Sequence, residues 1–194
     1  MRKLNKSYWE KKYNLADMAW DIGYIATPLR DYIDQLQDKQ LKILVPGAGN
    51  GYEVEYLVQQ GFTHVFVIDI ARQPLERIQE RLPNFPKHHL IEADFFDFQQ
   101  TDFDLVLEQT FFCALDPSLR RSYAFKMSQL LKEKGKLVGL LFDFPLTDTG
   151  PPFGGSASEY RTLFKDYFSI KILERAYNSI KPRAGTELFF IFEK

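Results

Sequence analysis

Cysteine is nearly absent from this 194-residue chain, and histidine is scarce: Cys113 is the single thiol, and there are three histidines. One thiol cannot form an internal disulfide, and one Cys with three His offers no metal-ligand cluster of recognisable spacing. We therefore expect a reducing compartment, the cytoplasm, and predict no metal site. Cys113 lies in an apolar run, where a cysteine is more often a small buried side chain than a nucleophile.

The sequence also lacks an excess of charge and lacks long apolar runs. Its 25 Lys and Arg nearly balance its 26 Asp and Glu, so no basic field favours nucleic acid or an anionic membrane. No run approaches the roughly 18 apolar residues of a membrane helix, and the N-terminus has no signal-peptide pattern. We expect a monomer with a small-molecule substrate and no nucleic-acid or membrane partner. Its length and 45% hydrophobic content predict one domain spanning residues 1–194.

Short apolar runs alternate with amphipathic stretches, which predicts an α/β fold with a mostly parallel sheet between helical layers. A Pro/Gly-rich loop follows at 145–155, before a shorter helix and two further strands. The expected strands are 41–47, 64–70, 88–94, 103–109, 136–144, 169–177 and 186–194, and the expected helices are 52–61, 71–82, 118–135 and 156–167.

Ligands of such sheets bind at the carboxyl ends of the strands, near the point where strand order reverses. Glycines after the first strand allow a tight turn and a close approach of the backbone to a ligand. An acid after the second strand can accept both hydrogen bonds of a ribose diol. The residues expected at this edge are Gly47, Gly49, Gly51, Asp69, Asp94, Phe95, Glu108 and Gln109.

The glycine spacing helps to choose between cofactors. The dinucleotide pattern G-x-G-x-x-G would need glycine where this chain has Tyr52, and no Gly-Lys-Ser/Thr of a P-loop follows. The loop at 46–52 also has no Lys or Arg for a pyrophosphate. A phosphate-free cofactor, S-adenosylmethionine, suits the loop better. An NAD-dependent oxidoreductase stays as an alternative only if Tyr52 can replace the missing glycine.

Several segments together resemble the thiopurine and thiol S-methyltransferase family of class I methyltransferases, and most closely its thiol and halide methyltransferase branch. The resemblance implies a single Rossmann-like domain with a seven-stranded, mostly parallel sheet and a C-terminal antiparallel strand. It also implies S-adenosylmethionine as the cofactor and S-adenosylhomocysteine as the product. The segments, which run from residue 9 to about 155, are WEKKY, WDIGYIATPL, LVPGAGNGYEVEYL, VIDI, EADFF, EQTFFCALDP and GPPF.

The resemblance also implies roles for individual residues. Residues 1–38 would form a helical lid that carries Trp20, with Trp9 and Tyr13 beside the cofactor. Gly47 and Gly49 would face the methionine part of the cofactor. Gln109 stands where plant relatives have Tyr, so its side-chain role stays open. The remaining implied contacts are Asp69 with Ile70 for the ribose, Asp94 and Phe95 for the adenine, and Glu108 with Gln109 at the end of the fourth strand.

Structural explanations compete with each of these roles. The two tryptophans could cap a helix over the core, and the glycines could form a plain strand-to-helix turn. Asp69 could be a helix N-cap, since Asp is favoured there. In a chain with 18 Phe, a core position for Phe112 competes with a place in the substrate wall.

The implied reaction is a direct in-line transfer of a methyl group to a small nucleophile, most simply a thiol, thiocyanate or a halide. Three residues are expected on the acceptor side: Asp143, Phe112 and Phe153. We expect the loop at 145–155 to set substrate selectivity, because long Gly/Pro loops after strands often cover sites. The alternative is a cofactor-binding relative that acts on another acceptor, such as a protein or a purine thiol.

Overall fold

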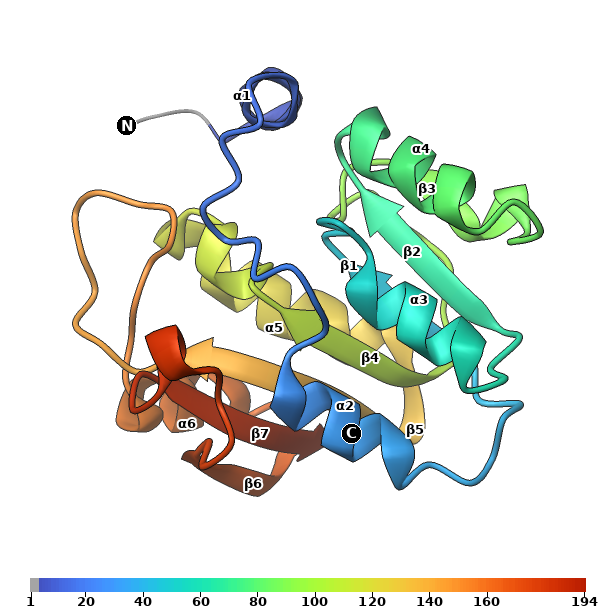
Figure 1. Cartoon of the computed structure of the whole chain (residues 1–194). Coiled ribbons are helices and arrows are strands. Elements are labelled where there is room, and N and C mark those ends of the chain that lie inside the picture. Colours follow the sequence, from blue (N-terminus) through green and yellow to red (C-terminus); the bar gives the residue numbers. More distant parts are fainter. Residues whose placement is uncertain (1–3) are drawn as a thin grey trace.

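Seven strands form one sheet in the order β3-β2-β1-β4-β5-β7-β6. The computed structural model describes residues 4–194 (Figure 1). All neighbouring strands are parallel except β7, which is antiparallel to both β5 and β6. The expected α/β fold, with a mostly parallel sheet and a C-terminal antiparallel strand, is confirmed. The strands are β1 (Ile43–Pro46), β2 (Val65–Asp69), β3 (Leu90–Glu92), β4 (Phe103–Gln109), β5 (Leu131–Phe142), β6 (Ser169–Arg175) and β7 (Glu187–Glu193).

Helices cover both faces of this sheet, because the strands are apolar on both sides. In β1, Leu44 belongs to the core beneath one helical layer, whereas Ile43 and Val45 belong to the core beneath the other. The first core contains residues of α5 (Arg120–Leu130) and α6 (Ala157–Phe164). The second contains residues of α2 (Thr27–Asp34), α3 (Tyr52–Gln59) and α4 (Arg72–Arg81).

The region between α5 and β5 differs from its prediction. We expected one helix over 118–135, ending at Lys134 and Gly135, but α5 ends at Leu130 and β5 begins at the next residue. Leu131 pairs with Phe103, and the register of the two strands then shifts before Lys136 pairs with Leu105. The intervening Lys132, Glu133 and Lys134 are exposed, with Lys134 at φ 64°. The Lys-rich segment that we expected at the end of the helix therefore forms an irregularity at the start of β5, where its charged side chains are exposed to solvent.

The N-terminal region is only partly helical. It contains α1 (Lys6–Asn14) and α2, and the segment at 15–26 between them has no regular structure. Residues 1–3 of the expected lid lie outside the described residues. No helix within residues 4–194 combines the length and the apolar character that crossing a membrane requires.

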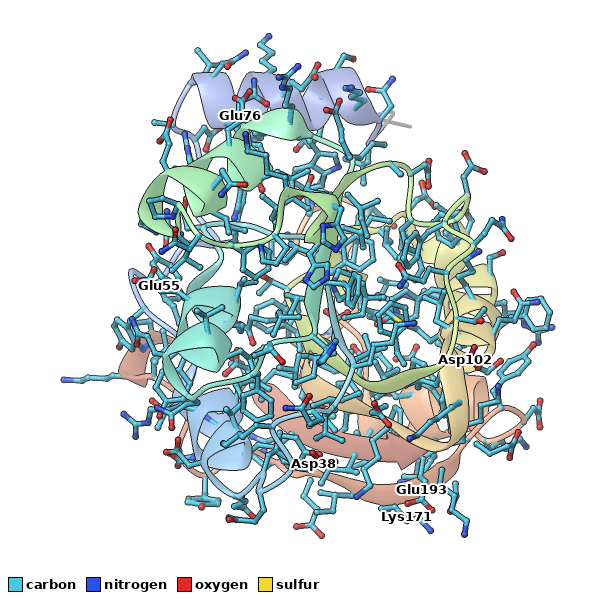
Figure 2. All side chains as sticks on the ribbon, turned by 90° about the vertical axis from the view of Figure 1, so that its right-hand side faces the viewer. Asp38, Glu55, Glu76, Asp102, Lys171 and Glu193 are labelled. Carbon is cyan, nitrogen blue, oxygen red and sulfur yellow. The ribbon has the colours of Figure 1, made fainter. Side chains whose placement is uncertain are left out.

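Strand order reverses between β1 and β4, because the chain builds β2 and β3 on one side of β1 and β4 and β5 on the other. Figure 1 shows α1, the orange loop after β5 and the red turn before β7 on the side toward which β2 and β5 point. The opposite edge is charged: Figure 2 labels Lys171 and Glu193 there, an ion pair at 3.1 Å. The fold thus distinguishes an edge with converging loops from a solvated edge.

Candidate functional site

A cavity of about 910 Å³ lies at the carboxyl ends of the strands. Its wall is made by α1, the irregular segment after it, the ends of β1, β2, β4 and β5, and the turn before β7. The switch-point rule placed a ligand site at this edge. The sequence-predicted residues that line this cavity are Trp9, Tyr13, Trp20, Gly47, Gly49, Asp69, Ile70, Asp94, Phe95 and Gln109.

The three glycines of the first loop have different surroundings, although all have positive φ. A Cβ at Gly47 would lie 2.6 Å from the ring of Phe111, and a Cβ at Gly51 would lie 2.4 Å from Ile78 in α4. Apart from the neighbours of Gly49 in the chain, a Cβ at this position would have one heavy atom of residues 4–194 within 4 Å, the Trp20 Nε1 atom at 4.0 Å. Gly49 therefore borders open space in the cavity, whereas Gly51 lets α3 approach α4.

Asp69, at the end of β2, is both a cavity residue and a structural acceptor. Its two carboxylate oxygens accept 2.8 Å hydrogen bonds, one from Ala48 N–H in the glycine loop and one from Ala71 N–H. Burial raises the pKa of Asp69 to about 6, against the opposing effect of the backbone N–H groups. The N-cap of α4 is Ala71, so Asp69 holds the approach to that helix without capping it.

Aromatic side chains from the N-terminal region form one side of the cavity. The Trp20 ring meets those of Trp9 and Tyr13 edge to face, with centroids 5.7 Å apart in both pairs. Tyr13 is 6% exposed, and burial raises the pKa of its hydroxyl. These rings therefore pack on one another and also face the cavity, so the structural and functional explanations of the tryptophans are compatible.

Asp21 fastens the segment that carries Trp20 to the glycine loop. Its Oδ2 accepts a 2.5 Å hydrogen bond from the Asn50 side-chain amide, and its Oδ1 accepts one from Gly23 N–H. Arg77 of α4 donates to the same Asn50 side chain at 3.2 Å. The N-terminal segment is thus tied to the loop that follows β1.

Glu108 differs from its expected place. It is fully buried in β4 and does not line the cavity. Its carboxyl accepts from the N–H groups of Phe111 and Phe112 at 2.9 Å and from the Tyr123 hydroxyl at 2.6 Å. Burial raises its pKa to about 7. Glu108 therefore holds the turn after β4, in which Thr110 has φ 58° and lines the cavity.

Gln109 lines the cavity, and its side-chain Oε1 is buried without a hydrogen-bond partner among residues 4–194. Behind it lies a hollow of about 10 Å³, also bordered by Cys113 and Glu187. That volume is close to the minimum that holds one water molecule. Cys113 is buried, as expected, and burial raises the pKa of its thiol, which keeps the proton on sulfur.

The three residues expected on the acceptor side do not line the cavity. Asp143 forms a 2.6 Å ion pair with Arg175 of β6. Phe112 is 1% exposed and packs against Tyr123 in the core. Phe153 is buried, and its backbone N–H donates to the Cys113 carbonyl at 2.8 Å. Phe112 and Phe153 are therefore core residues, whereas the Asp143 carboxylate is directed toward Arg175, whose side chain is exposed.

Other residues line the cavity on the side where we expected the acceptor, and we call this set the acceptor wall. They come from the end of β5, the loop at 145–155 and the turn before β7. Arg183 carries the one charge in the set, and its position in the segment NSIKPRAG followed no recognisable pattern. Pro151 and Pro152, by contrast, belong to the loop that we expected to cover the site. The acceptor wall consists of Phe142, Phe144, Pro151, Pro152, Pro182, Arg183 and Thr186.

The described side chains offer no obvious metal centre. Within residues 4–194, no three His, Cys, Asp or Glu side chains come close enough together to hold a metal ion. The three histidines are likewise outside the residues that line the cavity. The charged side chains that line the cavity are Lys12, Asp17, Asp69, Asp94, Asp116 and Arg183.

Comparison with known proteins gives a consistent result. Residues 4–193 match the family model for thiopurine S-methyltransferase. The chain is 31% identical to a probable thiol methyltransferase 2 of Arabidopsis thaliana, and the match covers 92% of this chain and 81% of that protein. It is 32% identical to thiocyanate methyltransferase 1 of Brassica oleracea, with the same coverage.

A solved structure supports the fold assignment. The 1,6-didemethyltoxoflavin-N1-methyltransferase of Burkholderia thailandensis, solved with 1,6-didemethyltoxoflavin and S-adenosylhomocysteine, superposes with a TM-score of 0.77. The match covers 97% of this chain and 86% of that protein, at 18% identity. The expected class I methyltransferase fold is confirmed.

Proposed function

Because the chain belongs to the thiopurine S-methyltransferase family and is an S-adenosylmethionine-dependent methyltransferase, we propose that it methylates small sulfur nucleophiles that react as anions. The acceptor is a thiolate or thiocyanate. It occupies the part of the cavity next to the acceptor wall, while the cofactor occupies the part next to β1, β2 and β3.

The residues at the strand ends suit the cofactor. Gly49 borders open space, which leaves room for a ligand against the backbone. The buried carboxylate of Asp69 can accept hydrogen bonds from a ribose diol, and Asp94 with Phe95 offers an acceptor and an apolar face to an adenine. The rings of Trp9, Tyr13 and Trp20 suit a sulfonium, because aromatic faces attract cations. In this proposal, residues 4–38 form a lid over the cofactor.

The acceptor wall suits a small, polarisable anion. It is mostly apolar, which excludes water and strengthens electrostatic attraction. Arg183 is its one charged member, and its guanidinium also pairs with Glu187, which is not part of this wall. The N–H groups that donate neither to Glu187 nor to the Trp20 carbonyl can donate to an anion, and such donation favours the ionised form of a thiol. A free thiol with a pKa of about 8.5 is only a few per cent ionised at neutral pH, so this bias raises the reactive fraction.

The cofactor supplies an activated methyl group, and the protein supplies binding and orientation. The acceptor wall would position the sulfur of the acceptor, and the aromatic rings would keep water away from it. Holding two reactants at a near-attack distance accounts for a large rate enhancement without a protein nucleophile. Cys113 also lines the cavity, but burial raises the pKa of its thiol, so this proposal gives it no role as a nucleophile.

The observation that carries this proposal is one continuous cavity that joins Asp69 and Asp94 to a wall whose only charge is Arg183. The test is a panel of acceptors: bisulfide, an aryl thiol, thiocyanate, iodide, 6-mercaptopurine and a cysteine-containing peptide. We expect the smallest sulfur anions to give the highest kcat/KM, measured by S-adenosylhomocysteine release.

The Asp69→Ala variant provides the background rate for each acceptor. A higher kcat/KM for the purine thiol or the peptide would overturn the proposed acceptor class. Calorimetry with S-adenosylmethionine and with NAD completes the test, and we expect heat with the former alone. Saturable binding of NAD would revive the oxidoreductase alternative.

A further inference from the structure

Trp20 lies in a segment without regular structure, so its position depends on contacts made from other parts of the chain. Its backbone carbonyl accepts a 2.7 Å hydrogen bond from Nη2 of Arg183, which is distant in the sequence. Its indole contacts the rings of Trp9 and Tyr13. An irregular segment with few local hydrogen bonds opens easily unless such long-range contacts hold it.

Arg183 is itself held in one orientation. Its side chain is 12% exposed and pairs with Glu187, which is 3% exposed, at 3.3 Å. The guanidinium lies 5.6 Å from the ring centroid of Phe142, at the end of β5. Glu187 is directly opposite Phe142 in the β5–β7 pairing, so the sheet fixes the carboxylate. Because a guanidinium donates from a planar fork, fixing one arm on Glu187 directs the other arm.

Burying the ion pair between Arg183 and Glu187 costs free energy. Two nearly buried charges lose hydration, and their attraction offsets this loss only when their remaining donors and acceptors find partners. The Trp20 carbonyl provides one of these partners. The same segment is tied on its other side by Asp21, through Asn50 of the glycine loop. Trp20 is therefore held between the cofactor loop and the acceptor wall.

We propose that Arg183 is a positioning residue which, oriented by Glu187, holds Trp20 over the cofactor end of the cavity and so links that end to the acceptor wall. This inference rests on the proposed function for the identity of the two ends. The positioning role is additional to any contact of Arg183 with the acceptor, because Arg183 acts through Trp20 whether or not an acceptor is bound.

The chain offers a direct test, because Trp9 and Trp20 are its only tryptophans. In a Trp9→Phe background, the fluorescence of the full-length protein reports on Trp20 alone. We expect Arg183→Gln in this background to shift the emission of the ligand-free protein to longer wavelength and to increase acrylamide quenching. We also expect the Kd for S-adenosylmethionine to rise about tenfold, the scale of a lost hydrogen bond to a charged group.

Two further variants separate positioning from general loosening. Arg183→Lys keeps a donor but loses the fork, so we expect emission between those of Arg183 and Arg183→Gln. Arg175→Gln is the matched control, because Arg175 bonds the Gly185 carbonyl in the same turn and does not line the cavity. It is expected to leave Trp20 emission unchanged.

The proposal is overturned if Arg183→Gln leaves the emission and quenching of Trp20 unchanged, or if Arg175→Gln changes them equally. Since both readings are made without an acceptor, they stand apart from the acceptor panel. Failure of the panel with a normal fluorescence response would refute the acceptor class and leave the positioning role intact.

Discussion

The carboxylate of Asp69 both stabilises the backbone around it and lines the cavity. It accepts from two backbone N–H groups and still lines the cavity, while burial raises its pKa to about 6. A ribose diol donates hydrogen bonds, so it prefers the ionised form of this carboxyl. In the proposed function, in which Asp69 binds the ribose of the cofactor, cofactor binding and ionisation of Asp69 are therefore linked.

This linkage predicts the pH dependence of cofactor affinity. Below a pKa of about 6, Asp69 is protonated in the ligand-free protein and must lose its proton on binding. We expect the Kd for S-adenosylmethionine to rise by up to about tenfold per pH unit below this value, and to be nearly constant above pH ~7. Calorimetry between pH ~5 and ~8 measures the effect. The Asp69→Asn variant should bind weakly and lack this dependence, and an unchanged pH profile in that variant would contradict the assignment.

The turn from β1 into α3 shows how a pattern expected for ligand binding also serves packing. Gly51 is the N-cap of α3 at φ 71°, and its backbone approaches Ile78 of α4. Gly61, beyond the other end of α3, also has positive φ, at 87°, but apart from its neighbours in the chain no heavy atom of residues 4–194 would lie within 4 Å of a Cβ there. A side chain at Gly61 would therefore cause backbone strain alone, whereas one at Gly51 would also conflict with its packing neighbour Ile78.

Substitution of these glycines by alanine should have unequal costs. Gly61→Ala introduces left-handed strain of about 1 kcal/mol. Gly51→Ala adds a steric conflict with Ile78, which lowers the free energy of unfolding by about a further 1–3 kcal/mol. We expect urea unfolding to show the larger loss of stability for Gly51→Ala. Equal losses would mean that α4 moves aside freely and that packing does not require this glycine.

Strand positions could be predicted because β1 and β2 are buried on both faces and read as continuous apolar runs. Their ends were harder to predict. We expected the fifth strand to include Asp143 and to aim it at the acceptor, but β5 ends at Phe142, which lines the cavity instead. Because side chains alternate along an extended chain, an error of one residue exchanges the inward and outward positions.

Some residues of the candidate site could likewise be predicted from the sequence, and others could not. Asp69 and Asp94 could be predicted because they follow parallel strands, whose carboxyl ends meet at one edge. Arg183 could not, since its place depends on the insertion of β7 between β5 and β6, a non-local pairing that no short pattern encodes. Glu108 had the right strand position, but its partner Tyr123 lies on α5 and draws it into the core.

Several buried carboxyls make the whole molecule sensitive to pH. Burial raises the pKa values of Asp69, Glu53 and Glu108 above those of exposed carboxyls. Between the unfolded and folded pKa values, the folded chain binds more protons than the unfolded chain. The free energy of unfolding from these groups therefore falls as pH rises through that window. The lowered pKa of His89 acts in the opposite direction, because the folded chain then favours the neutral ring.

A variant at Glu108 can test this effect for one group. Its contribution to stability changes over the pH range between the ordinary pKa of 4.5 and the raised pKa of about 7 in the folded protein. Glu108→Gln keeps the size of the side chain and resembles the protonated acid, but it does not titrate. The stability of the unsubstituted protein minus that of the variant should therefore fall by about 2 kcal/mol between pH ~5 and ~7. Urea unfolding at several pH values measures this difference, and contributions from His89 and Asp69 cancel in it. A difference that stays constant would show that Glu108 is ionised in the folded protein throughout, held by its hydrogen bonds from Phe111, Phe112 and Tyr123 despite its burial.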